Sequence, residues 1–343
     1  MSATSAPAEP AAPATETMTY REALRLALRE ELQRDERVFV MGEEVGLFEG
    51  SYKVTAGLLE EFGDDRIRDT PISEEGFVGA GIGAAMLGER PVVEIMTINF
   101  LLVAMDQVVN HAAKIGAMFG GEVRCPLVVR TPNGAGNQLT AQHSQSPDGW
   151  FAHVPGLKVV APATPADAKG LLKAAIRDDD PVLVIENLPI YKEKGEVPLD
   201  AGYVAPIGRA AVAREGQDVT LVAHGFAAVR ALQVARVLEE EHEVEAEVVD
   251  LRSLRPLDME TVAASVAKTN RAVCIEEGWP SYGVTAELAA RISHACFDDL
   301  DAPVERVGTA EVPLPYAKVL EQAALPHRDR ILAAALHTLD LSG

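Results

Sequence analysis

Apolar residues along the chain fall into two spacings, which predict amphipathic helices alternating with short buried strands. Residues 20–34 carry a leucine at every fourth position, as on the buried face of a helix. These positions are Leu24, Leu28 and Leu32. The next apolar run, residues 37–41, has the length of a buried strand. Helix and strand patterns continue to alternate beyond it.

The first half of the chain shows enough such elements for a complete sheet. Predicted strands cover residues 66–72, 91–96, 126–130, 158–161 and 182–186. Predicted helices cover residues 77–87, 101–119 and 165–177. A polar loop at residues 131–149, rich in Gly, Asn, Gln and Ser, follows the third of these strands. Strands of Val and Ile separated by helices predict a parallel sheet covered on both faces.

A second unit of the same kind is predicted after a break. The periodicity weakens between Leu188 and Ala205, where prolines and glycines mix with charges. Further strands (218–223, 245–251, 271–276 and 303–307) and helices (227–241, 259–268 and 285–295) follow it. We therefore predict an α/β fold of two domains, 18–200 and 206–343, with parallel or mostly parallel sheets. The length of 343 residues suits two domains of about 100 to 200 residues each.

Composition and charge narrow the classes of partner. No apolar run reaches the roughly 20 residues that cross a bilayer, so no membrane partner is predicted. Lys+Arg 31 against Asp+Glu 52 gives a net charge of −21. That charge repels phosphate backbones and anionic lipids, so nucleic acid is excluded as well and a basic protein partner is favoured.

Cysteine usage and the N-terminus indicate a reducing, cytoplasmic location. Cys125, Cys274 and Cys296 are far apart and show no C-x-x-C spacing, so neither a disulfide framework nor a zinc site is predicted. Residues 1–17 consist, after Met1, almost wholly of Ala, Pro, Ser, Thr and Glu. They lack the pattern of a signal or transit peptide, and we predict a disordered tail.

The segment from Thr70 to Gly76 is the first candidate for chemistry, because it joins a predicted strand to a predicted helix at the sheet edge where α/β proteins bind ligands. A purely structural interpretation is open beside it. Ser73 would cap the helix, while Glu74 and Glu75 would sit favourably in its first turn.

A glycine pattern from Gly79 to Ala84 fits the dinucleotide fingerprint G-x-G-x-x-A. The fingerprint belongs in a turn directly after a strand, whereas this pattern falls inside the predicted helix 77–87. Close helix packing is the favoured interpretation. A nicotinamide-binding oxidoreductase stays open only on this weak pattern.

The polar loop contributes a second candidate, His143. An imidazole at the functional edge of a sheet can donate a proton near neutral pH, or can simply be solvated or structurally hydrogen-bonded. A hydrolase built on Ser144 is disfavoured, since adjacent side chains rarely face each other and no G-x-S-x-G turn is present. Phe100, after the strand 91–96, would either stack on a flat ring or pack in the core.

Taken together, several segments resemble the beta subunit of the decarboxylating component of 2-oxo acid dehydrogenase complexes, in the same order from about Met18 onward. They are Gly42-Glu43-Glu44-Val45-Gly46, Asp69-Thr70-Pro71-Ile72-Ser73-Glu74, Glu94-Ile95-Met96-Thr97, Asp106-Gln107, Gln142-His143-Ser144-Gln145, His153-Val154-Pro155-Gly156-Leu157-Lys158-Val159-Val160, Asp167-Ala168-Lys169-Gly170-Leu171-Leu172 and Val249-Asp250-Leu251-Arg252. The resemblance implies a pyrimidine-binding transketolase-like domain followed by a transketolase C-terminal-like domain.

The resemblance also implies a cofactor, thiamine diphosphate, and roles for five residues. Glu74 would hydrogen-bond a pyrimidine ring nitrogen, Phe100 would stack on the ring, and Ile72 and Met96 would line its pocket. His143 would donate a proton or stabilise a transition state, either in decarboxylation or in acyl transfer to a lipoyl group. A carboxyl group suits the first role because burial raises its pKa and lets it share a proton.

Two metal ions follow from the same resemblance. A structural potassium ion would be held mostly by backbone carbonyls at Leu127, Ala175, Ile176, Asp178 and Asp180; the last position is often asparagine in the family. The magnesium ion of the diphosphate is held in this family by a G-D-G motif and a downstream asparagine pair. The nearest segment here, Gly63-Asp64-Asp65, has no such pair after it. Magnesium would therefore be held by an alpha subunit in an α2β2 heterotetramer.

The predicted function is the oxidative decarboxylation of pyruvate, with acyl transfer to the lipoyl domain of a dihydrolipoyl acyltransferase that also carries a subunit-binding domain. A branched-chain 2-oxo acid or acetoin is the alternative substrate, since Ser144-Gln145-Ser146-Pro147 is also found in branched-chain relatives. A scaffold subunit without catalysis is a further alternative, disfavoured by the presence of both Glu74 and His143.

Overall fold

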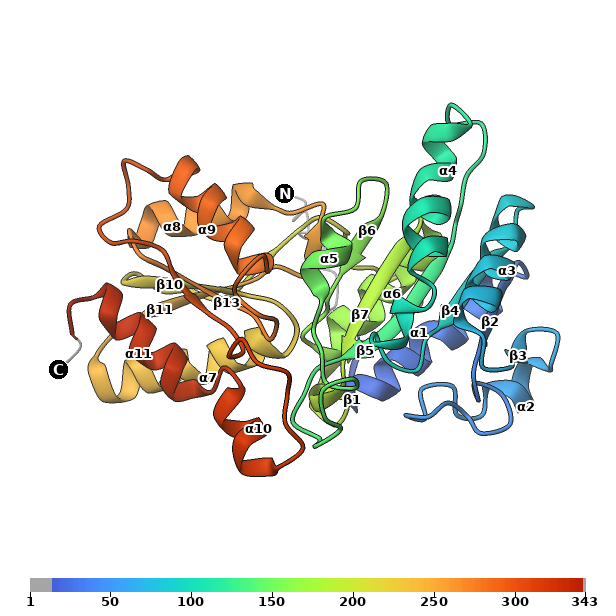
Figure 1. Cartoon of the computed structure of the whole chain (residues 1–343), viewed down its shortest axis with the longest axis horizontal. Helices are drawn as coiled ribbons and strands as arrows, with labels where there is room; N and C mark the ends of the chain where they lie inside the picture. Colours follow the sequence, from blue (N-terminus) through green and yellow to red (C-terminus); the bar gives the residue numbers. More distant parts are fainter. Residues whose placement is uncertain (1–13, 342–343) are drawn as a thin grey trace, which may run out of the picture.

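A seven-stranded sheet forms the centre of the first unit in a computed structural model that describes residues 14–341 (Figure 1). Its strand order is β12-β6-β7-β5-β4-β2-β3. The strands are β2 (Val38–Gly42), β3 (Ile67–Asp69), β4 (Arg90–Glu94), β5 (Val128–Asn133), β6 (Lys158–Val160), β7 (Val182–Asn187) and β12 (Ser253–Arg255). All pair in parallel except β12, which comes from the second half of the chain and lies antiparallel to β6.

Helices cover both faces of this sheet, as the alternating pattern predicted. The apolar faces of α1 (Tyr20–Arg34) and α6 (Pro165–Arg177) share one core cluster, and α3 (Glu74–Met86) belongs to another. Thr19 and Glu22 form a capping box at the start of α1. Short helices α2 (Leu58–Phe62) and α5 (Asp148–Ala152) complete the unit.

A five-stranded sheet with order β14-β13-β10-β11-β9 organises the second unit. Its strands are β9 (Ala211–Arg214), β10 (Val219–Ala223), β11 (Ala246–Asp250), β13 (Ala272–Ile275) and β14 (Glu305–Val307), of which only β9 is antiparallel. Helices α7 (Gly225–His242) and α11 (Arg328–Thr338) cover one face, and α8 (Met259–Thr269) and α9 (Val284–Ala295) cover the other (Figure 1). The predicted α/β class with mostly parallel sheets is confirmed.

One predicted helix is wrong as a continuous element. Residues 101–119 contain a 3-10 turn η1 (Phe100–Leu102), a wide π-type helix η2 (Gln107–Ala112) and a short α4 (Ala113–Met118). Apolar spacing predicts a buried helical face, but it does not distinguish hydrogen bonds over three, four or five residues. The amide of Val103, for example, donates to the carbonyl of Phe100.

The predicted tail and the predicted break both contain structure that local composition does not indicate. Thr15–Thr19 form β1, which pairs antiparallel with β8 (Lys194–Pro198) in a two-stranded sheet. The part of the expected tail at residues 15–17 is therefore a strand, and residues 1–13 lie outside the described residues. This pairing joins segments nearly the length of a domain apart, so no short window of sequence reveals it.

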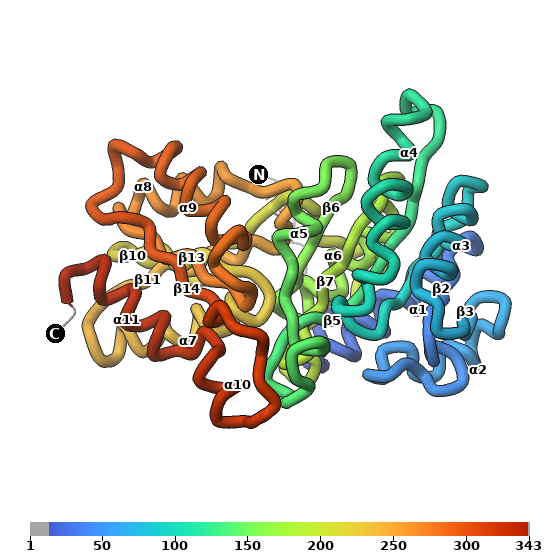
Figure 2. The backbone as a smooth tube through the Cα atoms, in the orientation of Figure 1, coloured from blue at the N-terminus to red at the C-terminus, as the bar shows by residue number. Residues whose placement is uncertain are grey.

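The two units pack directly against each other. One apolar cluster contains Phe151 and Leu157 from the first half of the chain together with Leu251 and Leu254 from the second. The loop after β5 runs beside α10 (Lys318–Ala324), as the backbone trace shows (Figure 2). Within residues 14–341, no helix has the combined length and apolarity needed to cross a bilayer.

Candidate active site

Three of the predicted site residues meet in one pocket of about 100 Å³ at the carboxyl ends of β4 and β5. Met96, Phe100 and His143 line it, and the ring centroids of Phe100 and His143 are 5.1 Å apart. The other lining residues are Tyr52, Thr97, Pro132, Asn133, Gly134, Leu139 and Leu188. The pocket combines an aromatic ring, a thioether and a half-buried imidazole, so it suits a flat ligand that also needs a proton donor.

The loop after β5 is held from the end of β4. The amide of Gln145 donates to Oδ1 of Asn99 at 3.3 Å, and Nδ2 of Asn99 donates to Oγ1 of Thr97 at 2.8 Å. His143 lies two residues before Gln145, and its own amide donates to the carbonyl of Thr140 at 3.2 Å. The Ser144 hydroxyl is buried without a hydrogen-bond partner among the described residues. A serine–histidine pair is therefore absent from this described loop, and the hydrolase alternative has no support.

Glu74 and Glu75 lie in different surroundings although they are neighbours. Glu74, the first residue of α3, is 7% exposed, whereas Glu75 is on the surface. Ser73 precedes the helix, but its side chain makes no capping hydrogen bond, so the purely structural interpretation of this segment loses its main element. Burial separates Glu74 from Glu75 as the candidate for chemistry.

A second buried carboxyl group, Glu43, follows β2 at the same edge of the sheet. Burial raises the pKa of Glu43, and the negative charge of Glu74 raises it further. Oε1 of Glu43 has no hydrogen-bond partner among the described residues. Glu43 was not predicted as a site residue, although its position directly after a buried strand is a usable signal in the sequence.

Ile72 does not join the pocket of Met96, Phe100 and His143. It is 84% exposed, two residues before the buried Glu74. Leu47, whose amide donates to the Asp69 carboxylate at 3.0 Å, is 87% exposed close by. Large apolar side chains left open beside a buried carboxyl group indicate a surface that a partner covers.

A buried ion-pair triad that no sequence pattern predicted joins the strands that carry the site. Nε and Nη2 of Arg130 on β5 donate to the two oxygens of Glu186 on β7, both at 2.6 Å. The remaining arm of Arg130 pairs with Glu94 at the end of β4. Burial raises the pKa of Glu94, and the charge of Arg130 opposes that rise. The triad fixes the spacing of three strands near the pocket.

The glycines of the dinucleotide-like pattern lie inside α3, as predicted. A Cβ at Gly81 would come within 2.8 Å of the Val93 side chain on β4, so glycine allows α3 to approach the sheet closely. This contact confirms close packing as the purpose of Gly81. The nicotinamide alternative loses the one pattern that favoured it.

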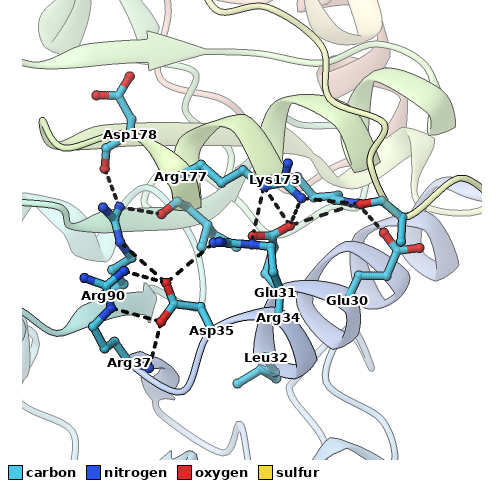
Figure 3. A network of polar contacts seen from close by, with 12 residues as sticks. Glu30, Glu31, Leu32, Arg34, Asp35, Arg37, Arg90, Lys173, Arg177 and Asp178 are labelled. Atoms are coloured by element: carbon cyan, nitrogen blue, oxygen red, sulfur yellow. Dashed lines mark hydrogen bonds and ion pairs between the residues drawn. The ribbon is translucent and has the colours of Figure 1, made fainter.

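The five residues predicted for potassium lie together, and each offers at least one oxygen that already contacts a protein donor. Nη1 of Arg90 donates to the carbonyls of Ile176 at 3.0 Å and Asp178 at 2.9 Å; Figure 3 shows this guanidinium directed at Asp178. The Leu127 and Ala175 carbonyls accept hydrogen bonds from the backbone amides of Val182 and Asp178, respectively. Lys158 pairs with the carboxylates of Asp178 at 2.7 Å and of Asp180 at 3.1 Å. A potassium ion would have to share these oxygens with the donors that already contact them.

Two successive parts of the chain match known protein families. Residues 16–193 match the family described as the pyrimidine binding domain of transketolase, and residues 208–331 match the C-terminal domain of transketolase. A solved structure described as a split gene transketolase, inactive beta4 tetramer, is similar in fold. Its TM-score is 0.76 at 23% identity, covering 95% of this chain and 99% of that one.

Curated proteins are similar over nearly the whole chain. The pyruvate dehydrogenase E1 component subunit beta of Rhizobium meliloti (strain 1021) is 51% identical, covering 96% of this chain and 72% of the relative. The mitochondrial subunit beta-1 of Oryza sativa subsp. japonica is 51% identical, with 94% and 87% covered. The mitochondrial subunit beta of Homo sapiens is 49% identical, with 96% and 93% covered.

Proposed function

The chain belongs to the family of pyruvate dehydrogenase E1 beta subunits, which have two transketolase-type domains, and on this premise we propose that it is the beta subunit of a thiamine-diphosphate-dependent pyruvate dehydrogenase. The proposed reaction is the oxidative decarboxylation of pyruvate, with transfer of the acyl group to a lipoyl group. About half of all positions are identical to relatives from a bacterium, a plant and a mammal, over more than nine-tenths of the chain. That observation carries the proposal.

Glu74 is proposed to control protonation of the cofactor. Its buried carboxyl group at the start of α3 would hold a proton toward a pyrimidine ring nitrogen, as the family resemblance implies. Phe100 and Met96 would offer the apolar surface for that ring. When bound, thiamine diphosphate would supply a carbon nucleophile for the 2-oxo group and a thiazolium ring that can accept the electron pair left by carbon dioxide.

His143 is proposed to move protons at the reacting end of the pocket. The imidazole lies against Phe100 in a loop fixed by Asn99, so it is oriented rather than freely solvated. A half-buried imidazole in that place can donate a proton during decarboxylation or during acyl transfer to the lipoyl group.

An alpha subunit in an α2β2 heterotetramer is proposed to complete the site. The chain lacks the G-D-G motif with a following asparagine pair, so magnesium and the diphosphate would be held by that partner. The exposed side chains of Leu47, Ile72 and Val103, which are 87%, 84% and 57% accessible, support a covering protein at this edge. The proposed second partner is a dihydrolipoyl acyltransferase with lipoyl and subunit-binding domains.

The proposal also includes a domain division, a cytoplasmic location and a structural potassium ion. We propose that the chain divides into 18–200 and 206–343, supported by the profile matches that end at residue 193 and resume at residue 208. A cytoplasmic location is supported by three buried free thiols, Cys125, Cys274 and Cys296.

A structural potassium ion would have to share the carbonyls of Ile176 and Asp178 with Arg90. Its test is the melting temperature of the chain in potassium chloride and in choline chloride, and equal values would exclude the ion.

The substrate is tested by reconstituting the chain with its alpha subunit. Initial rates with pyruvate, 3-methyl-2-oxobutanoate and acetoin give three values of kcat/KM on one preparation. We expect pyruvate to have the highest value. A higher value for 3-methyl-2-oxobutanoate or for acetoin would reassign the substrate, and equal inactivity with all three would restore the scaffold alternative.

A further inference from the structure

A carboxylate of the second unit holds the loop that carries His143. Glu321 of α10 is fully buried, at 0% exposure, and its Oε1 accepts the backbone amides of Gly136 and Gln138, each at 3.1 Å. Oε2 accepts the Gln138 amide as well, at 3.3 Å. We propose that Glu321 is a positioning residue for His143. The catalytic part of this inference rests on the function proposed above for His143.

The conformation of the loop explains why its amides need a carboxylate. Positive φ angles occur at alternate residues, 101° at Gly134, 100° at Gly136, 57° at Gln138 and 66° at Thr140. Such an alternation prevents a regular ladder and directs neighbouring N–H groups toward one point, a concavity that binds anions. Glu321 supplies that anion from more than 180 residues further along the chain.

Because Glu321 is fully buried, its carboxylate needs hydrogen-bond donors from the protein. No ion pair of Glu321 occurs within residues 14–341, so the loop amides are its principal compensation for lost hydration. An apolar cluster packs the beginning of the loop against the second unit beside these bonds. Its buried members are Ala135, Leu314, Ala324 and Leu325.

His143 lies between this contact and a second one. Glu321 fixes the loop at Gln138, five residues before the imidazole, and Asn99 fixes it at Gln145, two residues after. Loss of the first contact leaves the segment before His143 free to shift relative to Phe100. A misplacement of about 1 Å costs on the order of a hundredfold in rate, so Glu321 affects turnover without touching a ligand.

The test uses Glu321→Gln and Glu321→Ala in the full chain, with Glu260→Gln as a control of equal charge change. Glu260 is exposed on α8, in the same unit. Backbone hydrogen exchange at residues 136–145 measures the loop directly. The kcat of the reconstituted enzyme with an artificial electron acceptor is measured for each variant, alone and combined with His143→Ala.

We expect faster exchange at Gly136 and Gln138 in Glu321→Ala and at Gln138 in Glu321→Gln, with no change in the control. Glu321→Gln should keep a cooperative melting transition. The kcat of Glu321→Gln should fall at least about tenfold, and the substitution should add nothing in the His143→Ala background. Unchanged exchange would overturn the anchor. An equal further loss in the His143→Ala background would show that Glu321 does not act through His143.

The two proposals fail in different ways. Wild-type turnover of His143→Ala alone would overturn the proposed role of His143, while the exchange data would still decide whether Glu321 holds the loop. If Glu321→Ala does not fold, the isosteric Glu321→Gln carries the comparison, because it keeps the shape of the side chain and removes its charge. Its amide nitrogen would then take the place of Oε2 and face the N–H of Gln138, which cannot accept a hydrogen bond.

Discussion

The imidazole of His143 meets the ring of Phe100 at an angle of 89°, with 5.1 Å between the ring centroids. This edge-to-face contact joins the loop after β5 to the turn after β4, two segments at the same carboxyl edge of the sheet. It explains how a residue in a polar loop acquires a defined orientation. The contact also places the proposed proton donor and the proposed stacking residue in one pocket.

Replacement of His143 by alanine should therefore impair turnover rather than folding. We expect a loss of at least about a hundredfold, the usual scale for a proton-transfer group. Activity of the complete complex should fall at least as severely as activity with an artificial electron acceptor, because we expect the imidazole to matter most when the acyl group is transferred. His242→Ala, at the exposed end of α7, is the control. Wild-type rates in both assays would remove His143 from the site.

The contrast between Glu74 and Glu75 gives a paired prediction. Glu74→Gln should keep the melting temperature and lower turnover at least about a hundredfold, because glutamine matches the shape but cannot share the proton. Glu75→Gln changes an exposed side chain and should leave turnover within about twofold. Steady-state kinetics of both reconstituted variants check this. The reverse ranking would show that the assignment is displaced by one residue.

Asp250 should make the chain less stable as the pH rises. Burial raises the pKa of Asp250 to about 7, assisted by the negative charge of Asp167. Between these two pKa values the native state binds a proton that the unfolded state has lost. The contribution of Asp250 to the free energy of unfolding is therefore complete below about pH 4 and is lost as the pH rises through about 7. The shift from 3.8 to about 7 corresponds to at most about 4 kcal/mol.

Asp250→Asn removes this titration and gives the measurement. Denaturant unfolding between pH 4.5 and 7.5 should show the free energy of unfolding of the variant rising relative to that of the wild type as the pH increases. A difference that is constant over this range would mean that Asp250 has an ordinary pKa in the folded chain.

The acidic surface of the second unit should bind the basic subunit-binding domain of the acyltransferase. Two exposed clusters, Glu239-Glu240-Glu241 and Asp298-Asp299-Asp301, carry this prediction. The Debye length falls from about 10 Å at 0.1 M salt to about 3 Å at 1 M, so a charge-dominated contact weakens steeply. Calorimetric titration at rising salt measures the effect. An affinity indifferent to salt would exclude these clusters as the main contact.

Local signals in the sequence predicted the elements that local interactions form. The helices at 20–34 and 165–177 have the predicted bounds. Each begins directly after an N-cap threonine whose side chain accepts a hydrogen bond from a backbone amide. The burial of Glu74 followed from the resemblance, whereas the exposure of Glu75 was found only in the structure. The glycine pattern in α3 was placed correctly because a helix was visible around it.

Contacts between distant segments were not predictable from the sequence. Thr15–Thr19 pairs with Lys194–Pro198, and Glu321 holds a loop more than 180 residues away. Nothing near Glu321 in the sequence distinguishes it from a solvated glutamate on a short helix. Only the fold brings its carboxylate to the loop amides, and only burial makes that contact matter.

The central claim is that this chain supplies one half of a shared site. It is tested most directly by calorimetric titration of thiamine diphosphate and magnesium, first into the isolated chain and then into the chain mixed with its alpha subunit. The isolated chain offers Glu74 and the apolar surface of Met96 and Phe100, but no magnesium motif, and its net charge is −21. We predict weak or no binding and no turnover of pyruvate by the chain alone, with tight binding and turnover on mixing. Tight binding and turnover by the isolated chain would show that it carries a complete site, and would contradict the claim.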